Sequence, residues 1–76
     1  MSRRLDRERL RALRRERGLT QWDLALKAGV GIGTVRESER GGTYQPYPQT
    51  MRRLASALGC TVDDLLTEEA TKATGP

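Results

Sequence analysis

The residues that most often do chemistry in proteins are nearly absent from this sequence of 76 residues. It contains no histidine and one cysteine, Cys60, which excludes a histidine-based catalytic dyad, a disulfide within the chain and a structural zinc site. The neighbouring carboxylates Asp63 and Asp64 resemble an acid–base pair only superficially. They stand at the start of a helical pattern, where acidic residues interact favourably with the helix dipole. We therefore expect no enzyme, no cofactor and no metal.

Charge is distributed unevenly along the chain. The formal net charge is +4, and residues 1–17 contain eight arginines against three acidic residues. The segment 18–59 is weakly basic, whereas 60–76 has four acidic residues against one lysine. A basic body with an acidic tail favours a polyanionic partner such as nucleic acid. A solvated arginine-rich helix face explains the same charge without a partner, so both interpretations stay open at this point.

The elements that must position these charges are helices separated by glycine and proline. The sequence predicts five of them, over approximately 6–17, 21–28, 32–40, 48–58 and 62–66. A glycine follows each of the first four, and Pro48 suits the first position of a helix. No alternating pattern typical of β-strands appears. We therefore predict one all-α domain of five helices over 1–66, followed by a flexible polar tail over 67–76.

The chain shows no signal for a membrane or for secretion. No apolar run approaches the roughly 20 residues that a membrane-spanning helix needs. The basic N-terminus is not followed by the apolar stretch of a signal peptide. The single cysteine suits a reducing compartment. We therefore expect a cytoplasmic protein, associated with the nucleoid if its partner is DNA.

The most informative segment joins the predicted helices 21–28 and 32–40 through a short turn that begins at Gly29. Glycine permits a sharp turn, and Ala25 is small where the two helices must approach each other. Val35 is apolar where the second helix packs back onto the first. This is the geometry of a helix-turn-helix. The exposed side of the second helix is then available to enter the major groove of DNA.

Over about residues 9–66, the sequence resembles the lambda-repressor/Cro-like helix-turn-helix family, also called the Xre type. The matching motifs include Gly18-Leu19-Thr20-Gln21, Leu24-Ala25, Ala28-Gly29-Val30, Thr34-Val35, Glu39-Arg40-Gly41 and Ala57-Leu58-Gly59. The resemblance implies a small transcriptional regulator, a repressor that binds double-stranded DNA as a homodimer. An antitoxin or another subunit that binds a partner protein is the alternative.

The resemblance also implies a set of binding residues. Gln21 corresponds to the residue that contacts a DNA phosphate and braces the recognition helix, and the segment 43–45 corresponds to a loop that contacts the sugar-phosphate backbone. The DNA-binding residues are expected to be Gln21, Trp22, Gly31, Ile32, Gly33, Thr34, Arg36, Glu37, Arg40, Thr43, Tyr44 and Gln45. The dimer interface is expected around Cys60, Thr61, Val62, Leu65 and Leu66.

The recognition helix departs from the family pattern at its start. It begins with Gly31, Ile32 and Gly33, where the family usually has polar groups. A glycine reads no base edge, and Ile32 offers only an apolar contact, for example to a thymine methyl group. We therefore expect DNA shape and phosphate contacts to carry more of the specificity.

Several singled-out residues have a purely structural interpretation as well. Trp22 either lies against DNA or a partner protein, or folds over a loop at the edge of the core. Tyr44 and Tyr47 either touch the DNA backbone or pack against Pro46. Cys60 is expected to be a small apolar filler.

One ion pair is predicted inside the domain. Arg14 follows the apolar Leu13, and Glu39 lies four residues after Val35 on the inward side of its helix. A buried carboxylate needs a cation, and the guanidinium group suits it because it binds both oxygens. The family resemblance implies the same pair. We therefore predict a partly buried Arg14–Glu39 bridge with a structural role.

Overall fold

The computed structural model describes residues 3–67 of the chain. Within this range the order of elements is α1 (Arg7–Glu16), α2 (Gln21–Ala28), α3 (Ile32–Arg40), α4 (Pro48–Leu58) and η1 (Asp63–Leu65), a single 3-10 turn. The only extended pairing described is one isolated antiparallel bridge between Leu5 and Leu66. The predicted all-α class is confirmed. The prediction of five helices is wrong, because the segment 62–66 forms a 3-10 turn instead of a fifth α-helix.

Pairing with the N-terminal segment explains why the fifth helix does not form. Leu66 has an extended backbone, with φ −100° and ψ 150°, and lies opposite Leu5. One residue further on, the Thr67 N–H donates to the Arg4 carbonyl at 2.7 Å, and the Thr67 hydroxyl accepts from the Arg4 N–H at 3.2 Å. These contacts draw the chain out of the helical path after one turn. The rest of the predicted tail, 68–76, lies outside the described residues.

Local capping sets the bounds of the α-helices. Asp6 precedes α1 and accepts the Arg9 N–H at 3.1 Å, so it caps this helix instead of belonging to it. At the start of α2, the Thr20 hydroxyl accepts the Asp23 N–H at 3.0 Å, and the Asp23 carboxylate accepts the Thr20 N–H at 2.9 Å. These bonds, first that from the Thr20 backbone, hold the pKa of Asp23 below its ordinary value. Reciprocal bonds of this kind satisfy amide groups that a helix start would otherwise leave unpaired.

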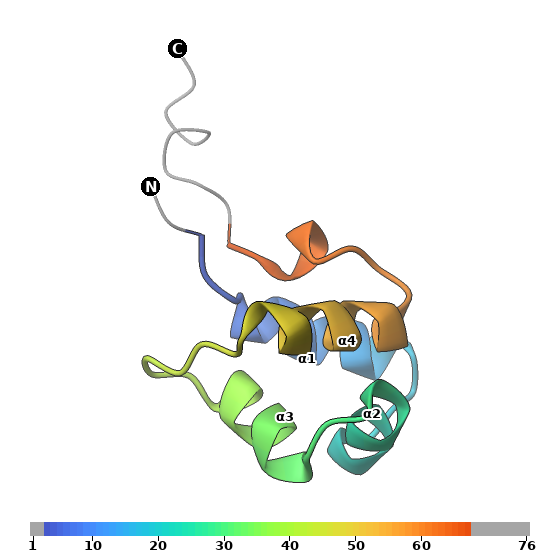
Figure 1. Ribbon diagram of the computed structural model, residues 1–76. Helices are drawn as coiled ribbons and strands as arrows, with labels where there is room; N and C mark the ends of the chain where they lie inside the picture. The colour runs from blue at the N-terminus through green and yellow to red at the C-terminus, as the bar shows by residue number, and fades with distance from the viewer. Residues whose placement is uncertain (1–2, 68–76) are drawn as a thin grey trace.

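The helices enclose one hydrophobic core, and the two ends of the described chain meet on one side of it (Figure 1). α2 packs against both α3 and α4, whereas α1 packs against α3 and η1. The α2–α3 pair is therefore held from two sides, by α4 through α2 and by α1 through α3. The side chains with almost no solvent exposure are Leu10, Leu24, Val35, Glu39, Leu54, Leu58 and Leu65.

Candidate nucleic-acid interface

The α2–α3 unit is built around a glycine turn. Gly29 has a left-handed backbone, with φ 72° and ψ 34°, and its N–H donates to the Ala25 carbonyl at 2.9 Å. Val30 donates to the same carbonyl at 3.0 Å. A residue with a Cβ atom is strained in this conformation, so glycine is needed for the helix to end here. After the turn the chain enters α3, which packs against α2.

α3 has two distinct faces. Val35 and Glu39, four residues apart, are buried together with Ser38. The buried Ser38 hydroxyl is not left unpaired, because its Oγ donates to the Thr34 carbonyl at 2.7 Å. The opposite face carries Gly33, Arg36 and Arg40, which are all exposed. α3 is therefore anchored along one side and presents the other to solvent.

Glu39 is the anchor of α3 and confirms the predicted ion pair. Glu39 is only 1% exposed to solvent. Its Oε2 accepts a hydrogen bond from Arg14 Nε at 2.6 Å, and its Oε1 accepts one from Arg14 Nη2 at 3.0 Å. Gln21 Nε2 also donates to Oε1, at 3.3 Å, and Arg11 Nε lies 3.6 Å from the same oxygen. Three helices, α1, α2 and α3, therefore meet at one carboxylate.

The charges of this cluster stabilise each other. Burial alone would raise the pKa of Glu39, but the hydrogen bonds from Arg14 and Gln21, together with the charges of Arg14 and Arg11, outweigh it. The net effect is a pKa for Glu39 below its ordinary value. The hydrogen bond to Glu39 raises the pKa of Arg14. Arg14 Nη1 also donates to the Leu19 carbonyl at 2.8 Å, so the fold uses all three of its nitrogens.

The sequence analysis did not predict one member of this cluster, Arg11. Arg11 Nη2 donates to the Glu39 backbone carbonyl at 2.8 Å, close to the end of α3. The available signal was its position three residues before Arg14, which places both on one face of α1. Arg11 supplies a donor to the last turn of α3, where helix carbonyls lack partners.

The exposed face of α3 carries part of the predicted DNA-binding set, including Gly33, Arg36 and Arg40. Arg40 Nη1 forms an exposed ion pair with Glu37 Oε2 at 3.2 Å. Arg36 forms no ion pair with any residue that the structure describes. Ile32 is partly buried and packs against the core, so only part of its side chain remains available to a base. Arg36 is therefore the cation of this helix that is most available to a partner.

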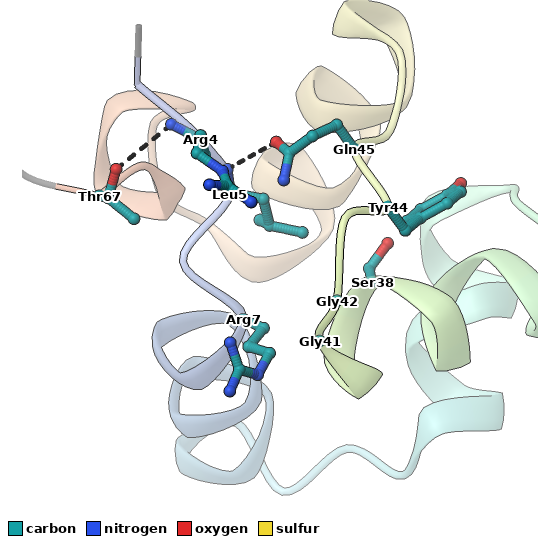
Figure 2. A pocket seen from close by; sticks show the side chains of 9 residues that line it. All are labelled: Arg4, Leu5, Arg7, Ser38, Gly41, Gly42, Tyr44, Gln45 and Thr67. Atoms are coloured by element: carbon teal, nitrogen blue, oxygen red, sulfur yellow. Dashed lines mark hydrogen bonds between the residues drawn. The ribbon is translucent and has the colours of Figure 1, made fainter.

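The loop between α3 and α4 borders a pocket of about 260 Å³ that also includes the N-terminal segment (Figure 2). The side-chain oxygen Oε1 of Gln45 accepts the Leu5 N–H at 2.9 Å, so this side chain joins the loop to the N-terminal segment. The ring of Tyr44 points away from Leu5 and Gln45. Thr43 is exposed, and Pro46 is buried. The contact of the segment 43–45 with DNA stays a prediction, and Gln45 has a structural role beside it.

Two apolar side chains on α2 are exposed. Trp22 is 57% exposed and Leu26 is 78% exposed. They are four residues apart and therefore share one face of the helix. Trp22 is not among the side chains that pack against the core, and its contact with DNA or with a partner protein stays a prediction. The sequence analysis missed Leu26, although its spacing from Trp22 was the signal for a shared patch.

The segment predicted to form a dimer interface is only partly available to a partner. Leu65 is completely buried, so its side chain supports this surface from beneath and contacts no partner. Val62 and Leu66 are partly buried and line a groove of about 380 Å³. Cys60 packs against the core as the predicted apolar filler, and burial raises the pKa of its thiol. Thr61 caps the following turn, where its hydroxyl accepts the Asp64 N–H at 3.1 Å.

The described residues hold neither a metal-binding cluster nor a membrane-spanning helix. None of their acidic or cysteine side chains cluster in a way that would hold a metal ion. None of the described helices has the length and apolar character that crossing a membrane requires.

The decisive comparison is with protein families. The profile of the family described as Helix-turn-helix matches residues 10–65, which span α2, α3 and most of the rest of the described chain. The chain belongs to this family. Its recognition as a lambda-repressor-like, or Xre-type, helix-turn-helix protein is therefore confirmed.

The chain is similar to transcriptional regulators of this family. It is 48% identical over 59 residues to the HTH-type transcriptional regulator DdrOP3 of Deinococcus deserti, a match that covers 78% of this chain and 45% of that protein. The chain spans less than half the length of the curated relatives it matches. The relatives include the transcriptional repressor RghR of Bacillus subtilis and the immunity repressor protein of Bacillus phage phi105.

Solved structures share the fold. The N-terminal DNA-binding domain of the biofilm regulator SinR from Bacillus subtilis is 30% identical, with a TM-score of 0.73 over 83% of this chain and 91% of that one. A complex of the SinR and SinI proteins is 29% identical, with a TM-score of 0.77 over 87% of this chain and 64% of that one. The fold of this helix-turn-helix protein is thus the fold of a known DNA-binding domain.

Proposed function

We propose that this helix-turn-helix protein binds specific sequences of double-stranded DNA and regulates transcription. The observation that carries the proposal is the arrangement of α3. One face is locked to α1 and α2 through the buried Glu39, and the opposite face presents Arg36 and Arg40 to solvent. A rigid helix with an exposed basic face suits insertion into the major groove. Contacts to phosphates hold the domain in register, and contacts to base edges select the sequence.

We further propose that the protein acts as a homodimeric repressor in the bacterial nucleoid. Val62 and Leu66 offer apolar surface for a second copy. In a two-fold symmetric dimer, the two copies of α3 would enter successive major grooves about 34 Å apart. A domain seated across a promoter would exclude other proteins from that DNA, which suits repression.

Salt dependence of binding tests this proposal. Sequences selected from a random DNA pool are titrated at several salt concentrations, and the logarithm of the association constant should fall linearly with the logarithm of the salt concentration. Arg36→Ala should relax the preference at one base position by about 1–3 kcal/mol. Failure of the unaltered protein to bind any duplex at low salt would refute the proposal. An equal loss on selected and random DNA would show that Arg36 contacts only phosphate.

A second candidate function is binding of a partner protein. It is favoured by the exposed pair Trp22 and Leu26 on α2, because a pair of large apolar side chains at the surface is typical of an interaction site. The structural neighbour SinR has been solved in complex with SinI. An antitoxin would use such a surface for its toxin. Replacing both side chains with glutamine should leave DNA binding unchanged if this surface serves a protein.

A further inference from the structure

Gly31 and Gly33 are glycines that the fold itself does not require. Gly31 precedes α3 with φ −72° and ψ 152°, and Gly33 lies within the first turn of the helix. Neither has the positive φ that the turn glycines of this chain adopt. A Cβ atom built on either residue would have no other atom within 4 Å beyond its chain neighbours and the backbone of its own helix. Backbone conformation and internal packing therefore both permit a larger residue.

Gly33 also makes α3 a weaker helix, and Gly31 adds no cap bond to it. Glycine disfavours a helix relative to alanine because it loses more backbone freedom on folding. Gly31 makes no side-chain cap bond, although serine, aspartate or asparagine would supply one at this position. Gly33 thus lowers the stability of the helix, and Gly31 leaves a cap bond unmade, while the space around both positions would accept a larger residue.

Their position relates them to the basic face of α3. Gly33 lies three residues before Arg36 and seven before Arg40, so all three share the exposed face. The glycine end of this face has no side chain, and the following turns carry cations. A surface of this kind admits the backbone of the helix close to a polyanion while the arginines reach past it.

We propose that Gly31 and Gly33 determine how closely α3 of this protein approaches DNA, because a side chain added at these positions would occupy the open space between this helix and the groove. The inference rests on the DNA-binding function proposed above. It assigns a role in binding to residues that form no contact through a side chain. It also accounts for the departure from the polar residues that the family usually has here.

The test compares stability and DNA affinity in the same variants. Gly33→Ala and Gly33→Leu add side chains of increasing size, and Gly31→Ser adds a helix cap. Ser56→Leu serves as the matched control for Gly33→Leu. Ser56 is exposed on α4, which packs on α2 and η1, so the added side chain lies on a different helix from the exposed face of α3. The probe is a duplex selected from a random pool with the unaltered protein, at one fixed salt concentration.

The expected result separates folding from binding. The urea midpoints of Gly33→Ala and Gly31→Ser should equal or exceed that of the unaltered protein. Gly33→Ala should bind the duplex about tenfold more weakly, which corresponds to about 1.4 kcal/mol. Gly33→Leu should lose more, and Ser56→Leu should bind as the unaltered protein does.

Two results would overturn the inference. One is affinity unchanged in all the glycine variants. The other is a fall in the urea midpoint that parallels the loss of binding, because the fold itself would then require the glycines. Failure of the unaltered protein to bind duplex DNA at all is a different result, which refutes the proposed function from which the inference starts.

Discussion

Breaking the Glu39 cluster should remove most of the stability of the domain. Glu39→Leu leaves the guanidinium of Arg14 buried without its carboxylate, and Arg14→Met leaves Glu39 without its bidentate partner. Loss of one member of a buried pair costs about 3–5 kcal/mol. Small domains have total stabilities of roughly 5–15 kcal/mol, and the limited core of so short a chain favours the lower end. Either single variant should therefore be close to unfolding.

The double variant distinguishes a coupled pair from two independent residues. Arg14→Met combined with Glu39→Leu replaces the ion pair with apolar side chains, so no buried charge is left without a partner. It should cost less than either single variant. Arg15→Met is the matched control, because Arg15 is an exposed arginine on the same helix. It should change stability by less than about 0.5 kcal/mol.

Urea denaturation followed by far-UV circular dichroism measures the stability of the unaltered protein and of the four variants. The coupling energy is the difference between the cost of the double variant and the summed costs of the single variants. Single variants that are each within about 0.5 kcal/mol of the unaltered protein, and strictly additive, would refute the reasoning. The bidentate contact would then contribute nothing to the folded state.

Acid provides an independent test of the same carboxylate. The folded pKa of Glu39 lies below its ordinary value, so the stabilisation is fully present above the unfolded pKa and is lost as pH falls through the folded pKa. Glu39→Gln should lack this part of the pH dependence. The contributions of Asp23 and Asp64, whose pKa values are also lowered by their cap bonds, should persist in the variant. Identical acid unfolding curves would show that Glu39 ionises alike in both states.

Three further variants test other parts of the structure. Gln21→Ala removes a hydrogen bond to the charged Glu39 and should cost about 1.5–3 kcal/mol in urea unfolding, while DNA binding weakens on all sequences alike. Val62→Asp should weaken self-association in sedimentation experiments, and a strictly monomeric unaltered protein, free and on DNA, would contradict the dimer. Gly41→Ala should cost about 1–3 kcal/mol, because φ 105° and ψ −162° is a conformation restricted almost entirely to glycine. Gly33→Ala adds the same methyl group without this strain and serves as its control.

The α-helices were predictable because residues close to each helix end determine where the helix begins and stops. A cap such as Thr20 with Asp23, or a glycine such as Gly29, acts through hydrogen bonds within four residues of the chain. The fifth helix was not predictable in this way. Thr61 and Asp64 do form reciprocal cap bonds, at 3.0 and 3.1 Å, of the kind that Thr20 and Asp23 form at the start of α2. The helix still ends after one turn, because its continuation pairs with a segment about 60 residues away in sequence, and no local pattern reports such a contact.

The same distinction applies to the candidate site. The Arg14–Glu39 pair was predictable because apolar residues near each of them indicate that both side chains border the core. A buried charge needs a partner of opposite charge, so the two were paired. Arg11 was missed because its contact is with a backbone carbonyl, which every residue carries and no sequence pattern marks. The open space around Gly33 likewise follows only from coordinates, since the sequence records a missing side chain but not what surrounds it.

The structure separates the residues that hold α3 from those that α3 presents. Glu39 lies on the buried face, and its contacts run to α1 and α2, away from the exposed arginines. Gly33 and Arg36 lie on the other face and contribute little to packing. Substitutions on the exposed face can therefore change sequence preference while the buried carboxylate keeps the helix in place. Changes at Glu39 should instead reduce stability and binding together, because a helix without its anchor has no fixed position against the groove.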